Sequence, residues 1–272
     1  EELDNYEALI ASLEESGLSE DQDVEALKAE INRLEERVEK LKEAAEAQAG
    51  RSAREYVGVG NRQYLTGLNL GGSRIVILVD ASASMLADSI VNVIRLRNMD
   101  AELQQTAPKW VRTLNTVDWL TAQLPINAQF QIIAFNTEAN SVLEEKKNRW
   151  LDVADAKLLK SATDALRQQL PSGGTSLHKA FDAVAALPGG PDNIFLITDG
   201  LPTQGDSPPR KTTISGRDRL ELFRSAVRRL PAGVPVNIIL APMEGDPMAA
   251  SEYWQLAQVT GGSFMSPSRD WP

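Results

Sequence analysis

A continuous apolar run at residues 74–79, Arg74 followed by Ile-Val-Ile-Leu-Val, most constrains the fold, because a strand without polar alternation has to be buried on both faces. Similar short runs recur along the chain, separated by segments with helical periodicity. The expected strands are 74–79, 129–135, 141–143, 193–197, 236–240 and 263–265. The expected helices are 108–124, 152–170, 176–187, 217–230 and 250–260. This alternation predicts an α/β fold with a doubly wound, mostly parallel sheet.

The first fifty residues differ from the rest in charge. They hold 16 acidic and 5 basic residues, whereas the remainder of the chain carries a net charge of +1. Apolar side chains from Val24 to Ala45 occupy the a and d positions of about three heptads. Gly17 and Ser19 precede them and are typical of a helix end and a helix start. We therefore expect a helical hairpin or coiled coil over 1–49. Either its two stripes fold on each other, or two chains self-associate through it.

The domain organisation follows from these patterns. A glycine-rich linker with one or two short strands is expected over 50–72, an α/β domain over 73–266 and a tail over 267–272. The chain begins at Glu1 rather than Met, which we interpret as a processed or trimmed form. Since no stretch of 18 uninterrupted apolar residues occurs, we expect contact with a membrane only through a missing upstream anchor.

Composition excludes several classes of protein. The chain has no cysteine, which excludes a disulfide scaffold, a zinc ribbon, an iron–sulfur protein and a cysteine nucleophile. Its single histidine excludes a histidine-rich transition-metal site. The main body is nearly neutral, so the basic patch of a nucleic-acid-binding protein is missing, and we expect no nucleic-acid partner.

Oxygen-bearing side chains follow two of the predicted strands and precede one helix. Asp80, Ser82 and Ser84 follow the first strand, Thr175 ends a Gly-Gly-Thr loop, and Asp199 follows a later strand. Ligands of parallel sheets bind outside the carboxyl ends of the strands, so these side chains should meet. Two carboxylates and three hydroxyls suit Mg²⁺, or else Mn²⁺ or Ca²⁺, and would leave a coordination position for a partner's carboxylate. The alternative is that they serve as helix caps and turns.

The same set of motifs resembles the von Willebrand factor type A (VWA) domain. Asp-x-Ser-x-Ser after the first strand, a Gly-Gly-Thr loop and Thr-Asp-Gly after a later strand occur in the order found in that family, where they form the metal ion-dependent adhesion site (MIDAS). The resemblance covers residues 73–266. It implies a doubly wound, Rossmann-like sheet with one short antiparallel edge strand, expected at 141–143.

The resemblance also implies a role for each candidate ligand. Ser82 and Ser84 would bind the ion through their hydroxyls, and Thr175 would bind it directly or through water. Asp80 and Asp199 would act directly or through water and would orient the hydroxyls.

Two segments depart from the family pattern, and we expect them to determine specificity. An insertion at 86–107 separates the first motif from the next helix, and Asp88 or Asp100 from it could occupy the metal's open position. A long loop at 201–217 lies on the same side. The candidate partner-binding residues in these segments are Arg95, Arg97, Arg210 and Lys211.

Enzyme motifs are missing: the sequence lacks a phosphate-binding loop, a dinucleotide fingerprint after the first strand and a nucleophile elbow. A triad of Ser84, His178 and Asp199 is conceivable, but we expect His178 to be a partly exposed helix residue. The predicted function is therefore non-enzymatic binding of a protein that presents Asp or Glu. A structural oligomer braced by metal and a metal-dependent hydrolase are the alternatives. The sequence resembles bacterial single-VWA proteins, which favours a membrane-tethered, periplasmic or cell-envelope location over the cytoplasm.

Overall fold

The computed structural model describes residues 33, 68, 70–209, 213–268 and 271. The chain divides into two compact units, Glu1–Arg51 and Ser52–Pro272. Apart from Arg33, which is helical and exposed, the hairpin or coiled coil expected over 1–49 lies outside the described residues. Self-association through that segment and the strands expected before residue 68 also lie outside them.

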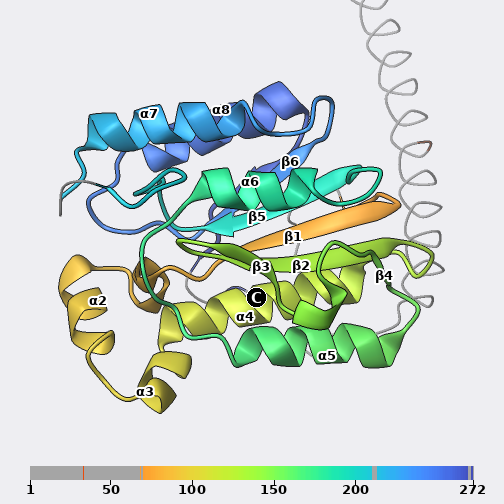
Figure 1. The fold of residues 1–272 in the computed structure, drawn as a ribbon, viewed down its shortest axis with the longest axis horizontal. Coiled ribbons are helices and arrows are strands. Elements are labelled where there is room, and N and C mark those ends of the chain that lie inside the picture. The colour runs from red at the N-terminus through yellow and green to blue at the C-terminus, as the bar shows by residue number, and fades with distance from the viewer. Residues whose placement is uncertain (1–32, 34–67, 69, 210–212, 269–270, 272) are drawn as a thin grey trace, which may run out of the picture. The chain divides into compact units, whose positions relative to one another are not determined.

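Within the described residues of the second unit, seven strands form one sheet (Figure 1). They are β1 (Arg74–Asp80), β2 (Gln129–Phe135), β3 (Ala139–Ser141), β4 (Leu151–Asp152), β5 (Asn193–Thr198), β6 (Val236–Leu240) and β7 (Phe264–Met265). Their order is β3-β2-β1-β5-β6-β7, and β4 also pairs with β2. The pairs β1–β2, β1–β5, β5–β6 and β6–β7 are parallel, whereas β3 and β4 run antiparallel to β2. The predicted mostly parallel α/β sheet is confirmed.

Helices cover both faces of the sheet. The helices of the described residues are α2 (Ile90–Leu96), α3 (Ala101–Gln105), α4 (Pro108–Gln123), α5 (Ala156–Arg167), α6 (Leu177–Ala185), α7 (Gly216–Val227) and α8 (Ala249–Thr260). Helices α4 and α5 lie on one face, and α6, α7 and α8 lie on the other (Figure 1). Along β1, Ile75, Ile77 and Val79 belong to the core under α4 and α5, while Val76 and Leu78 belong to the opposite core. Because neighbouring side chains enter opposite cores, this run of the strand has no polar position.

Two short edge strands differ from the sequence prediction. The antiparallel edge strand β3 lies at 139–141 rather than 141–143. Strand β4 occupies the start of the predicted helix 152–170, because Leu151 pairs with Phe130 of β2 and is buried. The helix itself begins after Asp155, whose carboxylate accepts hydrogen bonds from the N–H groups of the first turn of α5.

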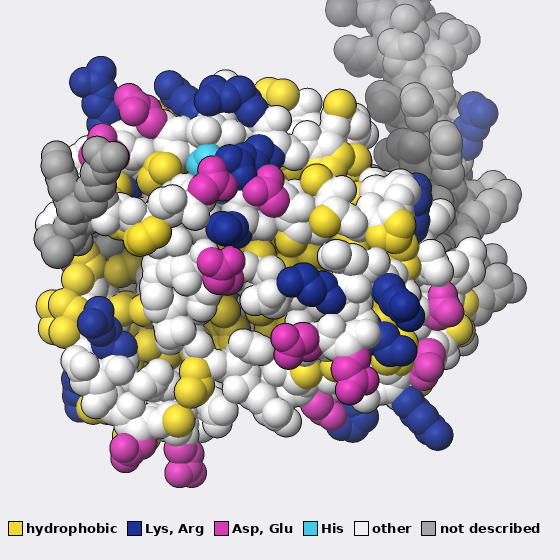
Figure 2. All heavy atoms as spheres, in the orientation of Figure 1, with side chains coloured by type: hydrophobic (Ala, Val, Ile, Leu, Met, Phe, Trp, Pro, Cys, Tyr) yellow, Lys and Arg dark blue, Asp and Glu magenta, His cyan; other side chains and the backbone are white. Residues whose placement is uncertain are grey.

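The insertion at 86–107 contains α2 and α3 and stands beside one end of the sheet (Figure 1). Its amphipathic first part forms α2, in which Val93 is buried. Ile90, Val91 and Ile94 are 49%, 76% and 53% exposed, and Figure 2 shows hydrophobic side chains gathered over this helix. Helix α4 begins at Pro108, where it was predicted. The insertion therefore presents an apolar surface next to the strand ends.

Candidate metal centre

Asp80 and Thr198 are the last residues of β1 and β5, which are neighbours in the sheet. Strands β2 and β3 follow on one side of β1 in the sheet, whereas β5, β6 and β7 follow on its other side. The crevice between β1 and β5 is therefore the point where the strand order reverses, and α/β sheets bind ligands at such a point. The Thr198 hydroxyl donates to Asp80 Oδ2 (2.8 Å), and the Ser82 N–H donates to Oδ1 (2.9 Å). Asp80 is fully buried. Its carboxylate is therefore held in one orientation by the two motifs that the sequence singled out.

A chain of side-chain hydrogen bonds joins the motifs of the two predicted carboxylates. The hydroxyls of Ser82 and Ser84 are 2.9 Å apart, and the Ser84 hydroxyl donates to Asp199 Oδ1 (3.0 Å). Ser82 is buried, whereas Ser84 is partly exposed. The structure thus brings Asp80, Ser82, Ser84 and Asp199 into one hydrogen-bonded set at the edge of the sheet.

The loop that carries Thr175 is fastened to this edge through its backbone, while the N–H of Thr175 itself donates to the hydroxyl of Thr203 (2.9 Å). The N–H of Ser172 donates to the carbonyl of Ala81 (2.9 Å), and the N–H of Ala83 donates to the carbonyl of Gly173 (3.1 Å). Gly173 has a φ of 72°, a left-handed backbone conformation that glycine adopts more readily than other residues. These bonds fasten the Gly-Gly-Thr loop to the turn that carries Ser82, and Thr175 is buried there.

The turn after β5 is clamped from α7 and from the segment before α8. The N–H of Leu201 donates to Asp246 Oδ2 (2.7 Å), and Arg219 donates to the Leu201 carbonyl through Nε (3.1 Å). Arg219 and Asp246 are themselves ion-paired at 2.7 Å. The Tyr253 hydroxyl donates to the carbonyl of Gly200 (2.9 Å). Both polar groups of the Leu201 backbone are satisfied, so the turn that carries Asp199 is held in place.

Sequence reasoning missed Lys109, which forms a buried ion pair with Asp199. Its ammonium lies 2.8 Å from Asp199 Oδ2, and the side chains of the two residues are 1% and 4% exposed. It also donates to the carbonyls of Ser84 and Ala87, each at 3.2 Å. One signal was present in the sequence: a lysine directly after Pro108 stands at the positive end of a helix dipole, where a cation is disfavoured without an acidic partner.

The ionisation of the buried Asp80 is opposed by its surroundings. Burial raises the pKa of Asp80 to about 7, and the negative charge of Asp199 contributes to the increase. The hydrogen bonds from Ser82 and Thr198 to the carboxylate act in the opposite direction. A positive charge next to Asp80 would stabilise its ionised form and oppose the shift.

The donors fit a hard divalent cation. Among the described residues, no cluster of three or more His, Cys, Asp or Glu side chains is placed to hold a metal ion. The atoms that converge at the strand ends are instead carboxylate and hydroxyl oxygens, the ligands that Mg²⁺, Mn²⁺ and Ca²⁺ prefer. Lys109 already supplies one positive charge to this set. A bound dication would have to share Asp199 with it.

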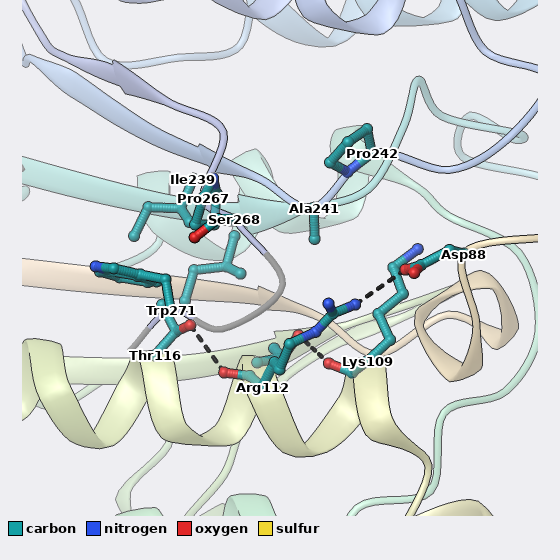
Figure 3. A pocket seen from close by; sticks show the side chains of 12 residues that line it. Asp88, Lys109, Arg112, Thr116, Ile239, Ala241, Pro242, Pro267, Ser268 and Trp271 are labelled. Atoms are coloured by element: carbon teal, nitrogen blue, oxygen red, sulfur yellow. Dashed lines mark hydrogen bonds and ion pairs between the residues drawn. The ribbon is translucent and has the colours of Figure 1, made fainter. Parts of the chain in front are cut away.

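The predicted partner-binding residues are only partly described. Arg95 and Arg97 are located on α2 and at its carboxyl end, whereas Arg210 and Lys211 lie outside the described residues. The carboxylate of Asp88 is ion-paired with Arg112 at 3.0 Å, and its role at the metal's open position stays a prediction, as does that of Asp100. Figure 3 shows this pair beside Lys109, at a pocket of about 150 Å³ between α4 and the end of β6.

His178 lies on a helix, as expected, but the expectation that it is partly exposed was wrong. The residue is buried on α6, and its Nε2 lies 3.0 Å from the hydroxyl of Ser225 on α7. Burial lowers the pKa of His178, and Arg229 lowers it further. Ser84 donates to Asp199 and not to an imidazole, so the conceivable triad of Ser84, His178 and Asp199 is not assembled.

Comparisons with solved structures concern the fold. The von Willebrand factor type A from Catenulispora acidiphila aligns with 73% of this chain and 39% of its own, at 17% identity and a TM-score of 0.48. A D319A mutant of the PilB minor pilin from Streptococcus sanguinis aligns at 14% identity and a TM-score of 0.43, covering 77% of this chain and 60% of its own. This chain therefore spans less than two thirds of the length of either protein. No curated protein matches the chain.

A comparison with models of protein families identifies a domain type in part of the chain. Residues 99–215 match the model described as the von Willebrand factor type A domain. The matched region contains Thr175 and Asp199 and begins after the Asp80–Ser84 motif, so the assignment of a MIDAS stays a prediction. The match supports a von Willebrand factor type A domain in the second unit of this chain.

Proposed function

We propose that this protein is a module that binds a protein partner through a divalent cation. Asp80, Ser82, Ser84, Thr175 and Asp199 would hold the ion, with Mg²⁺ preferred and Mn²⁺ or Ca²⁺ as alternatives. When bound, the ion supplies a positive charge and a coordination position that a partner's Asp or Glu can fill. The observation that supports this most is the set of buried carboxylates and serine hydroxyls at the ends of the adjacent strands β1 and β5.

The surroundings favour a protein as the ligand. Ser84 is partly exposed, so the hydrogen-bonded set reaches the surface. The insertion that follows it exposes apolar side chains of α2 and carries Arg95 and Arg97. Apolar surface next to basic side chains suits a partner segment that carries an acidic residue among hydrophobic ones. Binding without catalysis, self-association through 1–49 and a bacterial cell-envelope location stay predictions. Among the residues that the structure describes, none of the helices has the length and hydropathy of a membrane-spanning segment.

Metal binding is tested by replacing Asp80 with asparagine. The substitution keeps the shape of the side chain and removes one of the two charges, so we expect Mg²⁺ affinity to fall by about 10- to 100-fold. Isothermal titration calorimetry on the whole chain measures the affinity. Asp164→Asn is the matched control, because Asp164 is an exposed acid of α5 paired with Lys160. Equal affinities in the wild type and Asp80→Asn would refute the assigned ligands.

Recognition of a carboxylate needs a second measurement. Displayed peptides are selected on the whole chain in Mg²⁺ and eluted with EDTA. We expect the selected sequences to share an Asp or Glu, and their binding to disappear when that residue becomes Asn or Gln. If metal binds, but peptide binding changes neither on addition of EDTA nor on replacement of the Asp or Glu, the metal only stabilises the fold and the module is structural.

Metal affinity should depend on pH through Asp80. The pKa of this carboxyl is about 7 in the folded, metal-free protein, so below pH 7 protons compete with Mg²⁺ for it. We expect the affinity to fall about tenfold per pH unit below 7 and to be level above it. In EDTA, Asp80 holds its proton to higher pH in the folded state than in the unfolded state, so between about pH 4 and 7 its contribution to stability decreases as the pH rises. Calorimetry and chemical denaturation across about pH 5 to 8 measure both; an affinity that does not change with pH would contradict the assignment.

A further inference from the structure

Lys109 has the chemical features of a built-in cation. Its ammonium is almost completely buried and has three oxygen acceptors, namely Asp199 Oδ2 and the carbonyls of Ser84 and Ala87. These acceptors come from the turn after β5 and from the turn after β1. An ammonium with three oxygens from two loops bridges those loops as a bound metal ion would.

We propose that Lys109 is a positioning residue that assembles the site before metal arrives and lowers its affinity for divalent cations. This inference rests on the proposed function. Asp199 divides its two oxygens between different partners: Oδ2 accepts from Lys109, and Oδ1 accepts from the Ser84 hydroxyl. A dication bound by Oδ1 and Ser84 shares one carboxylate with the ammonium. Like charges on a shared ligand repel, and low exposure limits screening by solvent.

The position of Lys109 also links the insertion to the site. Ser84 and Ala87 lie just before α2, and Lys109 lies just after α3, in the first turn of α4. The hydrogen bonds from its ammonium therefore join the two ends of the insertion to each other and to Asp199. The lysine therefore ties the turn that precedes α2 to the start of α4 and to Asp199.

The test compares Lys109→Gln and Lys109→Met with Lys160→Gln. Glutamine keeps a hydrogen-bond donor without the charge, methionine removes both, and Lys160 is an exposed lysine in an ion pair on α5. We expect both Lys109 variants to bind Mg²⁺ at least about tenfold more tightly than the wild type in calorimetry on the whole chain. In EDTA both variants should also have a lower melting temperature than the wild type. Saturating Mg²⁺ should raise their melting temperature by more than it raises that of the wild type. Lys160→Gln should behave as the wild type.

The outcomes separate this inference from the proposed function. If the wild type binds Mg²⁺ and the folded Lys109→Gln variant binds it no more tightly, Lys109 does not oppose the metal and the inference fails alone. If only the Lys109 variants bind Mg²⁺, the lysine replaces the metal in the native protein, so the inference holds and metal-dependent function fails. Absence of binding in every variant overturns both. If Lys109→Met is unfolded in EDTA, the Mg²⁺ affinity of Lys109→Gln alone tests the inference.

Discussion

Asp199→Asn should destabilise the domain by about 3–5 kcal/mol in EDTA, because it leaves the Lys109 ammonium buried without a counter-charge. The amide keeps the size of the side chain but has only one oxygen. An amide that still accepts from Ser84 turns its NH2 group toward the ammonium, so the loss includes the hydrogen bond to Lys109 as well as the charge. Urea denaturation of the whole chain, followed by circular dichroism, gives the change in the free energy of unfolding.

A double variant tests the reason for this loss. Replacing the pair with Lys109→Met and Asp199→Leu removes both charges together, and such replacements of buried pairs are often neutral or stabilising. We expect the double variant to regain most of the stability lost in Asp199→Asn. Asp164→Asn, which breaks an exposed pair, should cost less than about 1 kcal/mol. A loss of that small size in Asp199→Asn would show that the Lys109 ammonium is satisfied by carbonyls alone.

The buried strands could be predicted because their signal is local. The bounds of β2 and β6 match the strands predicted at 129–135 and 236–240, because most of the side chains between those limits are apolar and pack into one of the two cores. The edge strands have no such signal. Leu151–Asp152 is too short to show a period, and its strand conformation results from pairing with β2.

Part of the candidate site could be predicted for a topological reason. In a parallel sheet the carboxyl ends of neighbouring strands coincide, so Asp80 and Asp199 had to lie close once β1 and β5 were neighbours. Lys109 and Asp246 could not be found this way. Each lies far in sequence from the turn it contacts, and each enters the site from the start of a helix or the segment before one. Their roles depend on how the insertion and the loop before α8 pack, which local pattern does not encode.

The clamp on the Asp199 turn predicts a second large effect. Asp246→Ala removes the acceptor for the N–H of the buried Leu201 and the ion-pair partner of Arg219, whose side chain is 21% exposed. Leaving a buried donor unpaired costs about 1–3 kcal/mol, and leaving a charge unpaired costs more. We therefore expect a loss of about 3 kcal/mol in urea denaturation, together with weaker Mg²⁺ binding, because the turn that positions Asp199 loses its support.

The matched control is Asp206→Ala, which breaks another acid–arginine contact, that of Asp206 with Arg229 at 2.6 Å. Asp206 is exposed, so its removal should cost less than about 1 kcal/mol and leave Mg²⁺ affinity unchanged. Arg219→Met separates the two parts of the clamp, since Asp246 then still accepts from Leu201. If Asp246→Ala loses stability while its Mg²⁺ affinity equals that of the wild type, the turn keeps its conformation without the clamp. Asp199 would then owe its position to Lys109 and Ser84, and the affinity of the site would depend on α4 rather than on α7.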